Sequence, residues 1–152
     1  MLWDALLDDR IDVVATDHAP HTLSEKQQPY TKAPSGGPLV QHALLGMLQN
    51  VKAGKISIEK MVEKMCHNPA MLFDVEKRGF IREGYYADLV QVSSQNSETV
   101  SRENVLYKCG WSPFEGTVFE HKVMRTFING HLAYDKGKFS EEHKAMRLTF
   151  NR

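Results

Sequence analysis

The spacing of hydrophobic and polar residues divides the chain into a helical first half and a strand-rich second half. Residues 2–8 have helical spacing of apolar side chains, and residues 11–16 form a short apolar run with a β-branched centre. Nearly every residue of this run after Asp12 is apolar, which is typical of a strand buried on both faces, as in a parallel sheet. The pattern therefore predicts one buried strand near the start of the chain, with helices after it.

Helical patterns follow over residues 38–53 and 57–65, and residues 68–73 are expected to form a further helical turn entered through Pro69. Pro38 suits the first turn of a helix, and Gly54 is typical of the residue that follows the last turn. Ser57 is expected to cap the next helix. These helices are expected to turn a common apolar face inward, made of Leu39, Ala43, Leu44, Met47, Leu48, Val51, Ile58, Met61, Val62 and Met65.

From Gly79 onward the chain consists of glycine turns and short runs rich in β-branched residues. Asn129-Gly130 lies between two such runs, and this dipeptide is the strongest short sequence for a β-hairpin. The runs predicted to be strands are residues 87–92, 122–128 and 132–134. The change of pattern places a boundary near residue 76 and predicts a small β module beyond it.

Composition and charge are those of a globular protein and exclude several classes. Of the 152 residues, 41% are hydrophobic and 25% charged, and the formal net charge at pH 7 is zero. No basic surface argues for nucleic acid, and no apolar stretch approaches the roughly 20 residues that span a bilayer. The N-terminus lacks the features of a secretory signal, and Cys66 and Cys109 belong to no CxxC pair. A reduced, cytoplasmic protein is expected, with no membrane partner.

The candidate chemistry lies in the sequence ATDHAPH, residues 15–21, directly after the predicted strand. In α/β barrels that end of a strand is the catalytic face, where Asp17 is placed to ligate a metal or to act as a general base. The alternative for Asp17 is a carboxylate that caps backbone N–H groups of the loop. Pro20 blocks a regular helix, so His18 and His21 cannot form a metal pair on one helix face. One of the two is expected to orient the loop and the other to bind substrate. For each alone the alternative is a hydrogen-bonded loop histidine, which we favour for His18.

A long loop separates these residues from the next helix. Residues 17–37 have no periodicity and contain three prolines, and structureless loops of about 20 residues are often functional. Ser35-Gly36-Gly37 precedes a helix N-terminus, where backbone N–H groups favour an anion and glycine allows close approach to a ligand. Taken alone, these residues are also typical of a flexible hinge. The remaining histidines lack ligand spacing and are expected to be surface or packing residues: His42, His67, His121, His131 and His143.

At these residues the chain resembles the dihydroorotases, which belong to the amidohydrolase superfamily of metal-dependent (β/α)8 enzymes. Thr16-Asp17-His18-Ala19-Pro20-His21 is similar to the signature at the end of the eighth barrel strand of that family. Hydantoinases and allantoinases share the Asp-His pair but usually lack a histidine at the position of His21. The resemblance covers residues 2 to about 139 and includes Asn68-Pro69-Ala70, Gly79-Phe80-Ile81, Ala87-Asp88-Leu89-Val90 and Ser112-Pro113-Phe114-Glu115-Gly116.

The resemblance implies an α/β fold that is the C-terminal end of a metal-dependent (β/α)8 TIM barrel, followed by a small β-sandwich module. Residues 1–75 would be the last strand and helices of the barrel, with the active-site loop over residues 17–37, and residues 76–152 the module. The chain is expected to be an incomplete fragment, because it has one barrel strand where the barrel needs eight. It also lacks the His-x-His pair of the family.

The resemblance further implies a reaction, the reversible cyclisation of N-carbamoyl-L-aspartate to dihydroorotate in pyrimidine biosynthesis. Asp17 matches the metal ligand that also serves as general base and acid, and His21 matches the histidine that binds the substrate carboxylate. Ser35 and Gly36 match loop positions whose backbone contacts the substrate. Zinc, as two ions in the full-length enzyme, is the implied cofactor, with most ligands outside this chain. The fragment alone is expected to be inactive, and the sequence leaves a homo-oligomer open.

Two alternatives remain at the level of sequence. The first is a related cyclic amidohydrolase of the hydantoinase or allantoinase type, which activity on dihydrouracil rather than dihydroorotate would reveal. The second is a non-catalytic dihydroorotase-like protein that acts as a structural partner of aspartate transcarbamoylase. Because a decayed relative would have lost its catalytic groups, the intact Asp17 and His21 argue against the second alternative.

Overall fold

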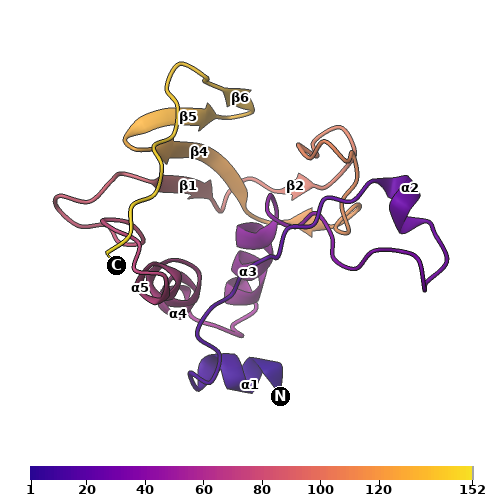
Figure 1. The fold of residues 1–152 in the computed structure, drawn as a ribbon, viewed down its shortest axis with the longest axis horizontal. Helices are drawn as coiled ribbons and strands as arrows, with labels where there is room; N and C mark the ends of the chain where they lie inside the picture. The colour runs from indigo at the N-terminus through magenta and orange to yellow at the C-terminus, as the bar shows by residue number, and fades with distance from the viewer. Residues whose placement is uncertain (152) are drawn as a thin grey trace.

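Helices dominate the first half of the chain and strands the second, as the sequence pattern predicts (Figure 1). The computed structural model describes residues 1–151. The helices are α1 (Leu2–Leu7), α2 (Leu23–Lys26), α3 (Ala43–Lys52), α4 (Ile58–Val62), the π-helix η1 (Glu63–His67) and α5 (Asn68–Leu72). The strands are β1 (Leu89–Ser93), β2 (Glu98–Thr99), β3 (Val118–Phe119), β4 (Lys122–Ile128), β5 (His131–Asp135) and β6 (Lys138–Phe139).

The prediction of a strand over residues 11–16 is wrong for this chain. A strand needs neighbouring strands for its backbone groups, and none of the described residues supplies one. Helical residues hold the segment instead. The N–H of Val14 donates to the carbonyl of Lys64 at 3.1 Å, and the side-chain amide of Asn68 donates to the carbonyl of Asp12 at 2.8 Å. The segment that leads into Asp17 is therefore fixed by side-chain and helix contacts.

A change of helical register makes the Lys64 carbonyl available for this contact. The N–H of Asn68 donates to the carbonyl of Glu63, five residues back, whereas an α-helix would use Lys64. In the same register the carbonyl of Lys64 would pair with residue 69, which is Pro69 and has no N–H. The π-helix and the proline together leave the carbonyl of Lys64 without a partner inside the helix. This carbonyl accepts the N–H of Val14 instead.

The side chain of Lys64 fixes the same segment at two more points. It is fully buried, and its Nζ donates to the carbonyl of Ile11 at 2.6 Å and to Oδ1 of Asp9 at 2.8 Å. Hydrogen bonds from Lys60 and then Lys64 lower the pKa of Asp9 from 3.8 to about 2. Because the folded pKa lies below the unfolded value, the stability from this pairing is complete above about pH 4 and is lost as the pH falls through about 2.

The helices after the long loop begin and end largely where the sequence places them. The side chain of Ser57 caps α4 by accepting the N–H of Lys60 at 3.1 Å, and Gly54 follows α3 with a φ of +70°, as predicted. The predicted helix over residues 38–53 begins late, at Ala43, because residues 38–42 form turns. In those turns the N–H groups of residues 39–41 bind side chains from other segments.

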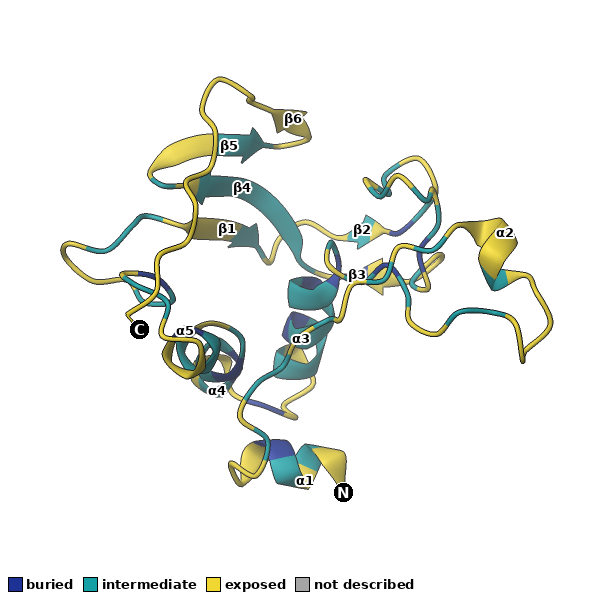
Figure 2. Ribbon diagram, viewed as in Figure 1, coloured by how far each residue is buried: buried dark blue, intermediate teal, exposed yellow. Residues whose placement is uncertain are grey.

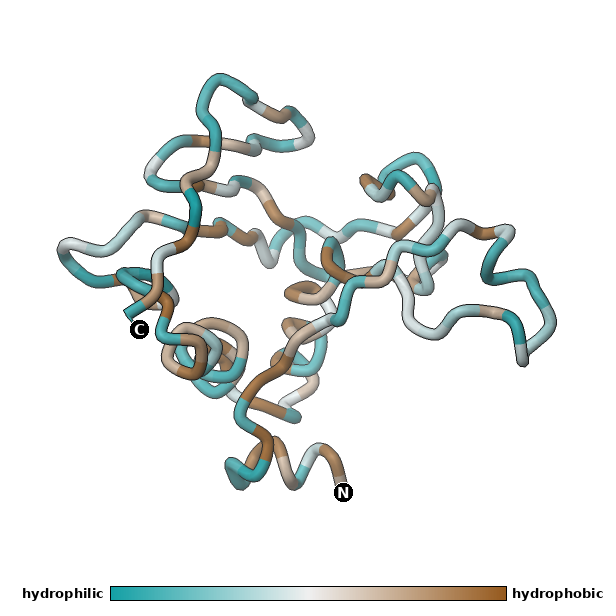
Figure 3. The backbone as a smooth tube through the Cα atoms, viewed as in Figure 1, coloured by the Kyte–Doolittle hydropathy of each residue, from teal (hydrophilic) through white to brown (hydrophobic). Residues whose placement is uncertain are grey.

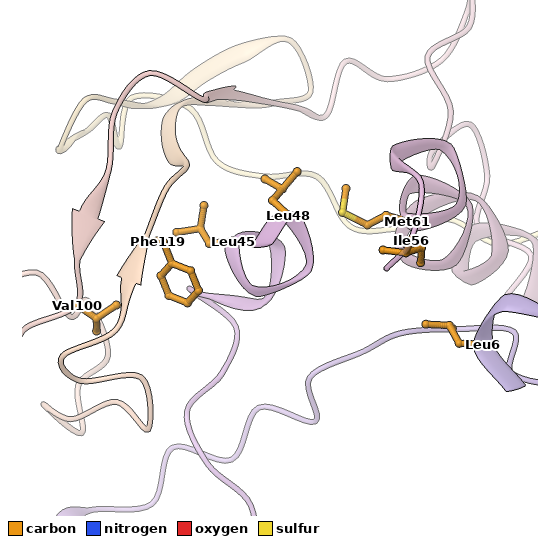
Figure 4. Close-up of a cluster of buried hydrophobic side chains, with 7 residues drawn as sticks. All are labelled: Leu6, Leu45, Leu48, Ile56, Met61, Val100 and Phe119. Atoms are coloured by element: carbon orange, nitrogen blue, oxygen red, sulfur yellow. The ribbon is translucent and has the colours of Figure 1, made fainter. Parts of the chain in front are cut away.

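A row of seven buried side chains joins the helices to the strands (Figure 4): Leu6, Leu45, Leu48, Ile56, Met61, Val100 and Phe119. Leu45 and Leu48 of α3 stand in the middle of this row, with Phe119 of β3 on one side and Met61 of α4 on the other. Met61 is 3% exposed, as predicted, whereas Ile58, the first residue of α4, was expected in the core and is 50% exposed. Val62 and Met65 pack against the cluster, as predicted.

The second half is built on an antiparallel four-stranded sheet with the order β1-β4-β5-β6. The hairpin between β4 and β5 turns at Asn129-Gly130, with φ values of 52° and 82°, which confirms the sequence prediction. The β4 strand covers Lys122–Ile128, the range predicted for it. Two short strands that the pattern did not show, β2 and β3, pair with each other, and β3 contacts α3.

Much apolar surface stays exposed on the helices, the sheet and the C-terminal tail (Figures 2 and 3). The accessible surface is 10591 Å², whereas a compact monomer of 17.3 kDa exposes about 7,800 Å². Leu72, Ile81 and Phe139 are each more than half exposed. Exposed apolar surface of this extent is typical of surfaces that further protein covers. Among the described residues, no helix has the length and apolar character that crossing a membrane requires.

We predict that Lys64→Met lowers the free energy of unfolding by at least about 1.5–3 kcal/mol, the value of one hydrogen bond to a charged group, since two such bonds are lost. The substitution keeps the buried stem but removes the bonds to Ile11 and Asp9. Lys60→Met is the matched control, because Lys60 also binds Asp9 but is less buried and makes no bond to the carbonyl of Ile11. Urea unfolding at pH 7 measures both, and a loss as large in Lys60→Met would contradict the role given to Lys64.

Candidate functional site

The two ends of the long loop, residues 17–37, lie side by side. His18 and Gly37 form a parallel bridge, and the N–H of Ala19 donates to the carbonyl of Gly37 at 3.0 Å. Gly36 lies against the same residue, since a Cβ added to it would be 2.7 Å from the Cβ of Ala19. The structure therefore brings together the two stretches in which the sequence places candidate site residues.

The second end of the loop requires glycine at position 36 and is held by a lysine. Gly36 has a φ of +83°, which side-chain-bearing residues rarely adopt, and its contact with Ala19 leaves no room for a Cβ. The Nζ of Lys26, on α2, donates to the carbonyl of Pro34 at 2.6 Å and to that of Gly36 at 2.9 Å. The position of the Ser35-Gly36 backbone is thus set by α2 as well as by Ala19.

The short helix α2 is an element that the sequence pattern missed. Thr22 caps it by accepting the N–H of Glu25 at 3.4 Å, and the Glu25 carboxylate accepts the N–H of Thr22 at 2.7 Å. The hydroxyl of Thr22 also donates to this carboxylate and holds the pKa of Glu25 below its usual value. The sequence Thr22-Leu23-Ser24-Glu25 is a capping box, which is the signal that could have revealed the helix.

Asp17 presents an unpaired carboxylate on a strained backbone. It is exposed and has a φ of +45°, in the left-handed region that costs a residue with a side chain about 1–3 kcal/mol. Within residues 1–151 its carboxylate has no hydrogen-bond or ion-pair partner. The capping role that was the alternative for Asp17 is therefore not observed, and the carboxylate is free for a group from outside these residues.

His18 is a hydrogen-bonded residue of the loop, as the sequence analysis predicted. Its Nδ1 accepts the N–H groups of Leu39 at 3.2 Å and Val40 at 3.4 Å, which ties the first end of the loop to the turns before α3. An imidazole that accepts at Nδ1 carries its proton on Nε2. The prediction of a hydrogen-bonded histidine at this position is confirmed.

His21 is held by its backbone and leaves its ring free. Its N–H donates to the carbonyl of Ala19 at 2.9 Å, and its carbonyl accepts the indole Nε1–H of Trp111 at 2.8 Å. The ring is half-buried and makes no hydrogen bond to the part of the chain that the structure describes. The imidazole is therefore available to a ligand while its main chain is fixed.

Residues 104–112, which we call the 104–112 loop, contact the site from the second half of the chain. The side chain of Gln41 donates to the carbonyl of Asn104 and accepts the N–H of Leu106, both at 2.8 Å. The hydroxyl of Tyr107 accepts the N–H of Gln41 at 2.9 Å, and its ring centroid lies 5.2 Å from that of His18. Sequence reasoning assigned no role to these residues, because no local pattern connects segments so far apart.

His42 is a packing residue, as predicted. It is 3% exposed, its ring stacks on Phe119, and its Nδ1 lies 3.3 Å from the Tyr107 hydroxyl and 3.4 Å from Oγ of Ser112. Burial lowers the pKa of His42, so the ring is neutral at pH 7 and forms hydrogen bonds with these hydroxyl groups.

The described residues do not make a metal centre by themselves. Within residues 1–151, no group of three or more His, Cys, Asp or Glu side chains is arranged to hold a metal ion. One cavity of about 380 Å³ lies between α3 and the four-stranded sheet, and one of about 260 Å³ lies beside α5. Neither cavity is lined by Asp17, His21, Ser35 or Gly36.

Comparison with known proteins gives matches to one family. The chain matches the Amidohydrolase family over residues 1–133. It is similar to the dihydroorotase of Halobacterium salinarum, with 40% identity over 134 residues (88% of this chain, 32% of that protein). The dihydroorotase of Clostridium acetobutylicum is 40% identical over 132 residues (86% and 31%). The D-hydantoinase (dihydropyrimidinase) from Thermus sp. has a similar structure, with a TM-score of 0.85 and 29% identity, covering 93% of this chain and 32% of that one.

We predict that Gly36→Ala opens the base of the long loop and lowers the free energy of unfolding by at least about 1–2 kcal/mol, the cost of a left-handed residue with a Cβ. The added methyl group would also collide with Ala19. Gly46→Ala is the control, since Gly46 lies inside α3 with nothing near its Cβ position and should stabilise the protein by up to about 1 kcal/mol. Equal shifts of the two urea midpoints would contradict the close contact at Gly36.

Proposed function

The chain belongs to the amidohydrolase family, and we propose from this that it is the C-terminal third of a dihydroorotase, a cytoplasmic enzyme of pyrimidine biosynthesis. It spans about a third of the length of the curated relatives it matches. Dihydroorotases at 40% identity and the Thr16–His21 sequence support this specific reaction. The observation that carries the proposal is the closed loop base, in which His18 and Ala19, next to Asp17, lie beside Gly36 and Gly37.

The same proposal divides the chain into two parts. Residues 1–75 would be the end of the (β/α)8 barrel and residues 76–152 a β-sandwich module. Residues 11–16 have no neighbouring strand among residues 1–151, which supports the first part, because a barrel would supply the strands beside them. The excess of exposed apolar surface supports both parts, since the rest of a larger protein would cover it.

In the proposed reaction Asp17 carries the proton. Hydrolysis of dihydroorotate breaks the ring amide bond, with water attacking the carbonyl carbon. The Asp17 carboxylate takes a proton from that water and delivers it to the leaving ring nitrogen; ring closure runs the same transfer backwards. The free, exposed carboxylate of Asp17 fits this task, since no other residue between positions 1 and 151 holds it in place.

Amidohydrolases are generally metal-dependent, and the donor set of this chain fits a metal only in part. A bound zinc ion would polarise the substrate carbonyl. A catalytic zinc site needs about three protein ligands, and Asp17 is the one that this chain would contribute. We propose that the other ligands lie in the remainder of the full-length protein, since residues 1–151 contain no group that could complete the site.

The substrate carboxylate would be bound by His21 and by the loop backbone. The ring of His21 is free, and the N–H groups of Ser35 and Gly36 have no acceptor within the described part of the chain. Together these donors suit an anion of the size of a carboxylate. A hydantoinase-type cyclic amidohydrolase is the second candidate, and the similar D-hydantoinase structure favours it. The substrates of a hydantoinase-type enzyme need no such carboxylate site. The effect of replacing His21 therefore distinguishes the two candidate functions.

We predict that residues 1–152 purified alone have no dihydroorotase activity, because they supply one wall of the site and one metal ligand. The full-length protein, assayed in the same buffer with zinc, is the positive control. A solution of zinc without protein gives the background rate. Turnover of dihydroorotate by the chain alone above this background would show that residues 1–152 contain a complete site.

We predict that His21→Ala in the full-length protein lowers kcat/KM for dihydroorotate about 10- to 150-fold, the cost of one hydrogen bond to a charged group. Hydrolysis of dihydrouracil, which has no carboxylate, should hardly change. Asp17→Asn is the matched comparison and should lower both activities about 10²- to 10⁴-fold, because it removes the proton carrier. Equal losses on the two substrates in His21→Ala would remove the argument for dihydroorotate.

A further inference from the structure

Two aromatic side chains of the 104–112 loop reach the histidines of the candidate site. Trp111 donates its indole N–H to the carbonyl of His21 at 2.8 Å, and the ring of Tyr107 lies 5.2 Å from that of His18. We propose that the 104–112 loop is a brace that fixes the positions of these two histidines, with Trp111 and Tyr107 as positioning residues. The proposal rests on the proposed function and adds a specificity-determining element to it.

Trp111 contacts both ends of the long loop at once. Its Nε1–H binds the carbonyl of His21, and the edge of its ring lies 3.8 Å from the position of a Cβ on Gly37. Because the N–H of His21 is bound to Ala19, both backbone groups of His21 are fixed. An indole suits this place, since it combines a large rigid surface with a single donor and has only two side-chain torsions. The imidazole of His21 therefore starts from a fixed main chain.

Tyr107 fixes the other side of the loop base. Its hydroxyl accepts the N–H of Gln41 at 2.9 Å and lies 3.3 Å from Nδ1 of the neutral His42. Its ring packs on His18, whose Nδ1 holds the N–H groups of residues 39 and 40. The hydroxyl remains protonated, because burial raises the pKa of Tyr107. One side chain thus sets both the turn before α3 and the plane of the His18 ring.

Hydrogen bonds along its length fix the 104–112 loop itself, so it can hold the two histidines in place. Asn104 donates to the carbonyl of Thr99 at 2.7 Å and accepts the N–H of Ser101 at 2.9 Å. Gln41 binds the loop backbone from the opposite side through Asn104 and Leu106. At the far end Ser112 is 5% exposed and accepts the N–H of Phe114 at 3.2 Å. The loop is thus tied down at its start, middle and end.

The test uses Trp111→Phe in the full-length protein, which keeps an aromatic ring and removes the indole donor. Losing one neutral hydrogen bond should lower kcat/KM for dihydroorotate about 2- to 12-fold, through a higher KM, and leave dihydrouracil unchanged. Because Trp111 acts through His21, the substitution should cause no further loss in the His21→Ala background. A loop that only stabilises the fold would affect both substrates and would add to the His21→Ala loss.

Hydrogen exchange measured by mass spectrometry gives a readout that needs no activity. Trp111→Phe should speed amide exchange in residues 17–23, and Tyr107→Phe should speed it in residues 39–42, where the hydroxyl binds Gln41. Trp3→Phe is the matched control. It makes the same chemical change in α1, away from the loop, and should alter neither exchange nor kinetics.

Each outcome decides the proposal. Unchanged exchange in residues 17–23 of Trp111→Phe overturns the brace, whatever the enzyme acts on. Faster exchange together with equal losses on both substrates, or with unchanged kcat/KM for dihydroorotate, also overturns it. If the wild-type protein hydrolyses dihydrouracil but not dihydroorotate, the proposed function fails. The exchange measurements then decide alone, with faster exchange supporting the brace and unchanged exchange refuting it.

Discussion

One unpaired carbonyl inside a helix determines how the chain enters its candidate site. The carbonyl of Lys64 has no helical partner, because the register has shifted by one residue and the next donor in line is a proline. Val14 fills that vacancy, while the Lys64 ammonium binds the carbonyl of Ile11. The η1 helix therefore does for residues 11–14 what neighbouring strands do in a sheet. The direction of the chain at Asp17 follows from these contacts.

The candidate site combines a firmly bound backbone with free side-chain ends. The main-chain groups of Ala19 and His21 are hydrogen-bonded, and the loop end at Gly36 is held by Lys26. The carboxylate of Asp17 and the ring of His21 have no hydrogen-bond partner within residues 1–151. Chemical groups that are positioned before a ligand arrives lose little entropy when it binds, which is the arrangement that catalysis and selective binding require.

The sequence predicted the features that depend on neighbouring residues and missed those that depend on distant ones. The Ser57 cap, the stop at Gly54 and the Asn129-Gly130 hairpin are local and were confirmed. The strand over residues 11–16 was wrong, because a strand exists only beside another strand. The contact of Trp111 with His21 spans 90 positions, so no local pattern announces it. The roles of Asp17, His21, Ser35 and Gly36 stay predictions.

The long loop is closed at its base by contacts that do not involve its tip. Its ends are joined by the Ala19–Gly37 bond and by the contact at Gly36, so the residues between α2 and Pro34 do not carry the closure. The entropy of closing a flexible loop grows only slowly with its length. The segment over residues 27–33 is thus a tip, in which insertions and substitutions are expected to leave the contacts at the loop base intact. Evolution could therefore change the sequence of this tip without changing the geometry of the loop base beside Asp17.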